Sequence, residues 1–103
     1  MYIKVHLPDD IEHYEPELRK FFELMVQKLY VNRFKGWGEN VTLELCHRLL
    51  MEEVDELAKA IKSEGQFQSL IECADVANIS VITALKLTRI TREEFERERK
   101  NVQ

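Results

Sequence analysis

Residues 43–63 read LELCHRLLMEEVDELAKAIKS, and their apolar side chains recur at three- and four-residue steps. This is the period of an amphipathic α-helix, which Thr42 can cap at its start and Gly65 can end. Residues 66–87, QFQSLIECADVANISVITALKL, predict a second helix with apolar side chains almost all round. Because such a helix is usually buried on nearly every side, we expect this one to be buried in the same way.

The segment before these two helices predicts another one. Pro16 fits the first turn of a helix, where its missing N–H group costs nothing. From there apolar residues continue at helical spacing to about Asn32. Residues 33–40, RFKGWGEN, hold two of the three glycines of the chain and predict a loop.

Both ends of the chain predict smaller elements. Residues 1–14 begin with alternating apolar and polar side chains and predict an extended arm or a minor strand. Residues 88–103 predict a short C-terminal helix and a charged tail, because Thr91 and Glu94 have the spacing of a capping box. The expected fold is one all-α domain over residues 1–103, an antiparallel helical bundle of three to four helices that is completed by oligomerisation.

Composition narrows the classes of function. The chain has 103 residues and a net charge of −4, and it lacks an extended basic run, which argues against a partner that is a nucleic-acid polymer. No apolar run approaches the roughly 20 residues of a membrane span, and the first ten residues lack the apolar core of a signal peptide. We therefore expect a cytoplasmic protein with no membrane partner. Cys46 and Cys73 lack metal-ligand spacing, and free thiols are the simpler interpretation, although the sequence alone leaves a disulfide open.

Carboxylates fall where the helical pattern expects core residues. With Leu45 at 0° and about 100° per residue, Glu53 falls at about 80°, inside the apolar arc, and Glu56 at about 20°, on its edge. On the following helix Glu72 and Asp75 are three residues apart and point the same way. A carboxylate buried without a positive partner costs several kcal/mol or becomes neutral.

Together the two pairs predict a metal site. Antiparallel helices about 8–10 Å apart would bring the pairs together, and clustered carboxylates repel one another unless a cation binds them. Oxygen ligands favour Mg²⁺ first and Mn²⁺ as a substitute. The alternative is a surface glutamate paired with a basic residue, which stays open for Glu52 because Arg48 and Lys59 are near it along the helix. For Glu72–Asp75 no basic residue shares the helix face within one turn.

Two motifs on consecutive helices carry a family resemblance. Residues 52–57 form an EExxEL motif, and residues 72–76 form ExxDV. In this order the chain resembles, over roughly residues 16–87, the MazG-like all-α nucleoside triphosphate pyrophosphohydrolases, in particular their short, single-domain, phage-like members. The superfamily also contains dimeric dUTPases, whose large helical insertions this sequence lacks, and phosphoribosyl-ATP pyrophosphohydrolases. The resemblance implies Mg²⁺-dependent cleavage of nucleoside triphosphates to monophosphate and pyrophosphate.

The resemblance also implies roles for individual residues. The Mg²⁺ ligands would be the four carboxylates of Glu53, Glu56, Glu72 and Asp75. Either Glu52 or Glu56 would orient or deprotonate the attacking water. Asn78 is a contact to the sugar or base, or else a satisfied polar group of the bundle. In the loop, Lys35 and Arg33 are phosphate contacts or solvated charges, and Trp37 stacks on a nucleobase or plugs the bundle end.

Self-association is expected as well. Active sites of the family are commonly completed by neighbouring subunits, and the apolar residues of the first and third helices exceed what three helices can hide. We therefore expect a homodimer or homotetramer. Two other functions stay open: a substrate-specific relative acting on dUTP, dCTP or phosphoribosyl-ATP, and a non-catalytic helical interaction or regulatory module. Base selectivity is not fixed by the sequence, because base contacts come from loops and partner subunits.

Overall fold

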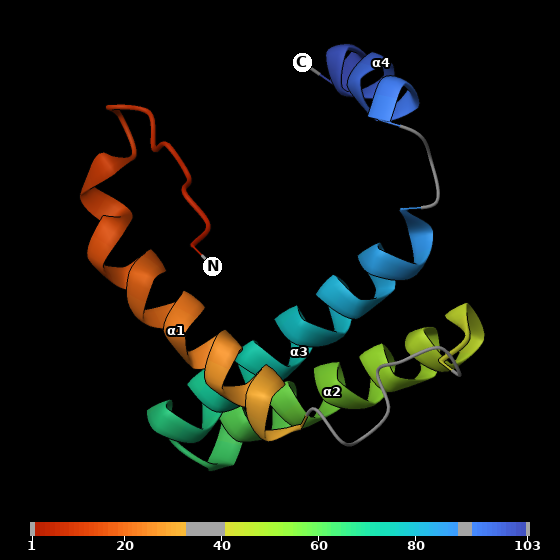
Figure 1. Ribbon diagram of the computed structural model, residues 1–103. Helices are drawn as coiled ribbons and strands as arrows, with labels where there is room; N and C mark the ends of the chain where they lie inside the picture. The colour runs from red at the N-terminus through yellow and green to blue at the C-terminus, as the bar shows by residue number, and fades with distance from the viewer. Residues whose placement is uncertain (1, 33–40, 89–91, 103) are drawn as a thin grey trace.

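The computed structural model describes residues 2–32, 41–88 and 92–102, and the protein is all-α over these ranges (Figure 1). In chain order the elements are the 3₁₀ turn η1 (Glu12–Tyr14) and the helices α1 (Glu15–Val31), α2 (Leu43–Ser63), α3 (Gln66–Leu87) and α4 (Arg92–Val102). The described ranges contain no strand. None of their helices combines the length and the apolar character that crossing a membrane requires.

Local chemistry sets the ends of the main helices. The Thr42 hydroxyl oxygen accepts the backbone N–H of Leu45 at 3.1 Å, so it satisfies one of the N–H groups that a first helical turn leaves unpaired. Gly65 has φ 90° and ψ 175°, a combination that essentially only glycine adopts. The chain therefore turns from α2 into α3 at this residue. Pro16 lies in the first turn of α1. These predicted helices are confirmed.

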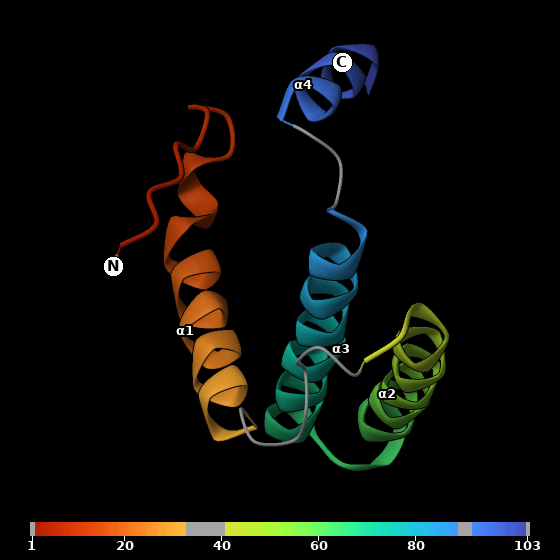
Figure 2. The same ribbon diagram turned by 45° about the vertical axis from the view of Figure 1, so that its right-hand side comes forward.

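The helices form a hairpin with a third helix on one side (Figure 2). α2 and α3 pack along each other, and α1 packs on α3. Within the described ranges α1 does not contact α2, and α4 contacts none of the other helices. The predicted all-α class is confirmed. The antiparallel bundle and its completion by oligomerisation stay predictions.

The small core lies between α2 and α3, at the end where α2 begins. Val41, Cys46 and Ile82 are buried there, and Leu45 and Ile79 pack against them. Cys46 is almost completely inaccessible. The core thus uses the apolar stripe that the sequence predicts for α2.

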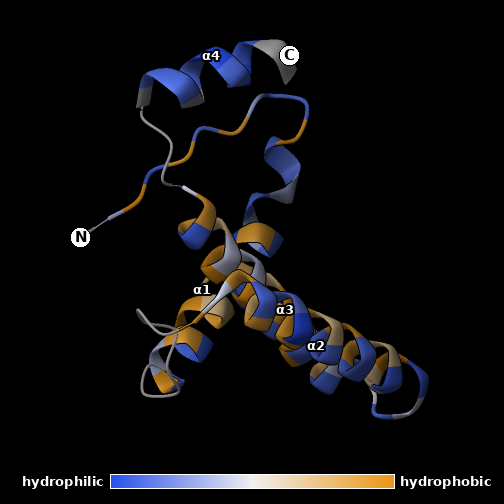
Figure 3. Cartoon of the chain, turned by 90° about the vertical axis from the view of Figure 1, so that its right-hand side faces the viewer, coloured by the Kyte–Doolittle hydropathy of each residue, from blue (hydrophilic) through white to orange (hydrophobic). Residues whose placement is uncertain are grey.

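The expectation that α3 is buried on nearly every side is wrong for the single chain. α1 and α2 cover only part of its surface, and Figure 3 shows apolar residues along its length. Four large apolar side chains of α3 are between 36% and 58% exposed: Leu70, Val81, Leu85 and Leu87. Periodicity predicted the helix correctly, but burial depends on how many neighbours cover it.

The N-terminal arm is shorter than predicted. Residues 2–8 have no regular structure, as expected. The N–H of Ile11 then donates to the carbonyl oxygen of Pro8 at 3.0 Å, and η1 follows, so the extended arm ends before residue 14. The predicted C-terminal helix is present as α4, whereas Thr91, the predicted cap, lies outside the described residues. The cysteines, Cys46 and Cys73, are free thiols, as the simpler interpretation expected.

Candidate functional site

Three of the four predicted metal ligands lie together between α2 and α3. One carboxylate oxygen from each of Glu53, Glu56 and Glu72 lies within 4.8 Å of the other two. Glu53 and Glu56 are one turn apart on α2, and Glu72 faces them from α3. The three-residue spacing and the short turn at Gly65 therefore bring these acids together, as the sequence predicts.

Two of these carboxylates have a buried oxygen without a hydrogen-bond partner. Glu72 is only 7% exposed, and its Oε1 accepts from Nε2 of Gln68 at 2.9 Å. Its Oε2 is buried and unpartnered, and so is Oε2 of the half-buried Glu53. Buried carboxylate oxygens are normally paired, since leaving them unpaired is costly. Oxygen atoms in this state are the ligands that Mg²⁺ and Mn²⁺ prefer, so the residues fit a divalent cation.

The electrostatic field at the cluster is negative. The pKa of Glu53 is raised from 4.5 to about 6, first by burial and then by the negative charges of Asp75, Glu56 and Glu72. Lys28 acts in the opposite direction. A nearby positive charge would stabilise the ionised form of such a carboxylate and lower its pKa. The field therefore favours capture of a cation.

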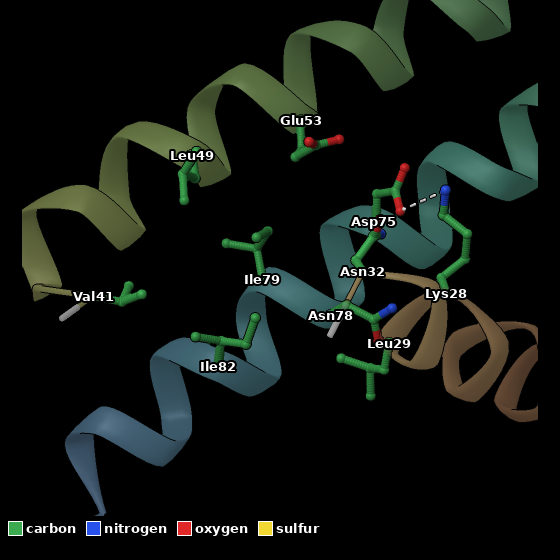
Figure 4. A pocket seen from close by; sticks show the side chains of 10 residues that line it. All are labelled: Lys28, Leu29, Asn32, Val41, Leu49, Glu53, Asp75, Asn78, Ile79 and Ile82. Atoms are coloured by element: carbon green, nitrogen blue, oxygen red, sulfur yellow. Dashed lines mark ion pairs between the residues drawn. The ribbon is translucent and has the colours of Figure 1, made fainter. Parts of the chain in front are cut away.

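Asp75 departs from the prediction. It is outside the three-carboxylate group, and its Oδ1 lies 3.5 Å from Nζ of Lys28 (Figure 4). The sequence offers no basic residue on this face of α3 within one turn, but a helix from elsewhere in the chain supplies one. Lys28 comes from α1, far away in the sequence.

Asn78 anchors α1 on α3. Its side chain is buried, and its Nδ2 donates to the carbonyl oxygen of Met25 at 3.0 Å. Its Oδ1 is buried and has no partner. Met25 is three residues before Lys28 on α1, and Asn78 is three residues after Asp75 on α3, so both contacts belong to one helix–helix surface. The amide nitrogen of Asn78 is therefore satisfied within the fold, whereas its Oδ1 is not, and its contact to substrate stays a prediction.

A pocket of about 410 Å³ opens beside the cluster (Figure 4). Leu49, Ile79 and Ile82 contribute to its apolar wall. Its polar lining residues come from all three packed helices and are Lys28, Asn32, Glu53, Asp75 and Asn78. A concave site of 300–1,000 Å³ with apolar walls and a few convergent polar groups is typical of small-molecule sites. The two charged ends of the Lys28–Asp75 pair lie in this lining.

The predicted water-activating and loop residues differ in where they lie. Glu52 is exposed and lies outside the three-carboxylate group, whereas Glu56 is exposed but belongs to it. Of these two candidate carboxylates, the structure therefore places only Glu56 in the group. Arg33, Lys35 and Trp37 lie outside the described residues, so their predicted contacts stay predictions.

Comparison with known proteins adds no relative. No family model matches the chain, and neither a curated protein nor a solved structure matches it. The two motifs and the geometry of the cluster and pocket are therefore the features of this chain that bear on its function.

Proposed function

We propose that this chain is a Mg²⁺-dependent nucleotide pyrophosphohydrolase, which cleaves the α–β phosphoanhydride of nucleoside or deoxynucleoside triphosphates to monophosphate and pyrophosphate. The observation that carries the proposal is the pair of buried, unpartnered carboxylate oxygens on Glu53 and Glu72, beside a pocket of small-molecule size. The EExxEL and ExxDV motifs supply the link to the MazG-like enzymes.

The ligands of the cation would be Glu53, Glu56 and Glu72, joined by Asp75. Mg²⁺, when bound, supplies charge neutralisation and orientation for the phosphate oxygens. The carboxylates would hold it in place, because helix backbones fix their positions on both sides of the interface. Asp75 must leave Lys28 to join them, since the two side chains are paired in this structure.

Glu56 is the preferred group for activating water. Its carboxylate belongs to the cluster and is open to solvent, so water can reach it. In hydrolysis Glu56 accepts the proton of the water whose oxygen attacks the phosphoanhydride. Glu52, one helical turn before Glu56 on α2, is the second candidate. It is less suitable because it is exposed and lies outside the cluster.

The pocket suits the nucleoside part of the substrate. Its apolar wall can cover a base or sugar, and the unpartnered Oδ1 of Asn78 can accept a hydrogen bond from either. Lys35 and Trp37 remain the predicted loop contacts to phosphate and base. Base selectivity stays open, so dUTP, dCTP and phosphoribosyl-ATP are included among the candidate substrates.

A homodimer or homotetramer is part of the proposal. On α1, Phe22, Val26 and Tyr30 recur at four-residue steps and are between 55% and 65% exposed. With the uncovered apolar side chains of α3 they leave a large hydrophobic surface, which marks association sites in soluble proteins. A stable, folded monomer of 12.3 kDa in light scattering at micromolar concentration would contradict this part.

The test of the proposed activity is a hydrolysis assay with separated products. The purified protein is incubated with Mg²⁺ or with a chelator and a panel of nucleotides, including dUTP, dCTP and phosphoribosyl-ATP. We expect monophosphate and pyrophosphate in the Mg²⁺ samples only. Diphosphate and orthophosphate would show that a different bond is cut. No turnover of any nucleotide would favour the non-catalytic interaction module, which the exposed apolar surfaces also suit.

A further inference from the structure

Lys28 is a basic residue of the site that lies outside the two sequence motifs. Among the described residues that line the pocket it is the sole basic one, and it also lowers the pKa of Glu53. Its helix is held in place by the hydrogen bond from Asn78 to Met25, one turn before it. The position of Lys28 at the edge of the carboxylate cluster is therefore built into the packing of α1 on α3.

The pair that Lys28 makes with Asp75 is easy to exchange. Charge-assisted N–H···O hydrogen bonds are about 2.7–2.9 Å long, whereas these two atoms are 3.5 Å apart. Both side chains keep some contact with solvent, with 28% and 18% of their surfaces exposed. Lysine has a flexible four-carbon stem, so its ammonium group can move while the helix stays in place.

A divalent cation bound in the cluster would compete with Lys28 for Asp75. Asp75 would then face two positive charges on the cation in place of one on Lys28. The unpartnered Oε2 atoms of Glu53 and Glu72 are the oxygens that such a cation would satisfy. Lys28 would be left partly buried without an anion, which is unfavourable. The phosphate chain of a nucleotide entering the pocket supplies that anion.

We propose that Lys28 is a polyphosphate-binding residue of this site, paired with Asp75 in the metal-free protein and transferred to the phosphate oxygens of the substrate when Asp75 turns to the cation. The inference rests on the proposed function, because it takes the cation and the oligophosphate chain from it. Lys28 thus keeps the empty site from accumulating uncompensated negative charge and later contacts the ligand.

Binding measurements without turnover test this role. The variants are Lys28→Met, which keeps the stem and removes the charge, Lys28→Gln as a second neutral variant, and Lys28→Arg, which keeps the charge. Lys20→Met is the matched control, because Lys20 is exposed on the same helix and does not line the pocket. Circular dichroism establishes that each variant is folded.

The first arm titrates Mn²⁺ alone by calorimetry. Removing Lys28 removes the competing cation, so both neutral variants should bind Mn²⁺ at least about threefold more tightly than the wild type. The second arm titrates inorganic tripolyphosphate with Mg²⁺ in excess. Here the neutral variants should bind at least about tenfold more weakly, which is the usual effect of losing a charged hydrogen bond. Lys28→Arg and Lys20→Met should stay within about threefold of the wild type.

The possible failures are distinct. If folded Lys28→Met and Lys28→Gln bind tripolyphosphate like the wild type while the wild type hydrolyses nucleotides, Lys28 is only a packing residue and the inference is overturned. If the wild type neither binds Mn²⁺ nor releases pyrophosphate, the proposed function is overturned and the assignment of Lys28 with it. Opposite shifts in the two arms support the transfer, because simple loss of helix packing would weaken both ligands together.

Discussion

The interface between α2 and α3 has an apolar end and an acidic end. At the apolar end Cys46 and Ile82 are buried, as a helical stripe dictates. At the acidic end the same stripe carries Glu53, which faces Glu72 across the interface, and both have unpartnered oxygens. The apolar end stabilises the hairpin, whereas the carboxylates at the acidic end repel one another, and the cation of the proposed function would relieve that repulsion. We therefore expect substitutions at the apolar end to lower the free energy of unfolding, and substitutions at the acidic end to weaken cation binding.

The largest effect is expected from Glu72→Gln. The amide keeps the size of the side chain but cannot provide a negatively charged oxygen ligand, so kcat/KM for nucleotide hydrolysis should fall at least about 100-fold. Metal-free stability should stay equal or increase, because a negative charge beside Glu53 and Glu56 is removed. The control is Asp55→Asn, an exposed position on α2 outside the cluster. Hydrolysis at the wild-type rate by Glu72→Gln would remove this residue from the site.

At the apolar end we expect the opposite result. Ile82 is 8% exposed, and Ile82→Ala should lower the free energy of unfolding by about 2–3 kcal/mol, since it leaves a cavity in a small core. Chemical denaturation measures this, and Mn²⁺ affinity of the folded variant should change little. Ile61→Ala is the matched control, because Ile61 is 67% exposed on α2. Equal losses in the two variants would mean that the core does not lie where described.

The smallest effect concerns Glu53 and pH. Its folded-state pKa of about 6 is above the value of 4.5 for an unperturbed group, so the ionised carboxylate destabilises the metal-free fold. This contribution is absent below pH 4.5, grows as the pH rises from 4.5 to about 6, and is complete above that. Glu53→Gln should therefore raise the free energy of unfolding at pH 7 by about 1 kcal/mol, after allowance for solvent screening.

Denaturation in the presence of a chelator at pH 4.5, 6 and 7.5 measures this difference. The gain from Glu53→Gln should vanish at the lowest pH, and saturating Mg²⁺ should reverse its sign at pH 7.5, because the wild type alone keeps the full ligand set. A constant difference at all three pH values would mean that Glu53 does not titrate as its surroundings require.

Local signals were sufficient for the helices and for most of the acid cluster. The hydroxyl of Thr42 and the backbone freedom of Gly65 act on their immediate neighbours, so the bounds of α2 and α3 follow from the sequence. The approach of Glu53 and Glu72 also follows, because a short turn joins two helices whose acidic faces are given by periodicity. These features need no knowledge of the rest of the chain.

The remaining features depend on docking between distant segments. The pairing of Lys28 with Asp75, and the bond from Asn78 to Met25, arise from how α1 lies on α3, which no local pattern specifies. The exposure of Leu85 likewise depends on the number of neighbours around α3. Arg33–Asn40 lies outside the described residues, so the predicted loop contacts are not tested.

The turn at Gly65 determines how the predicted ligands of α2 and α3 are placed relative to one another. All four predicted ligands lie between Glu53 and Asp75, within one helical hairpin, and Gly65 has a backbone conformation that side-chain-bearing residues avoid, although a Cβ there would meet no atom within 4 Å. The relative placement of all four predicted ligands therefore depends on this one turn. Binding of a cation to these ligands would then slow amide hydrogen exchange along both α2 and α3. A substitution that strains the turn at Gly65 would weaken cation binding although all four carboxylates are kept.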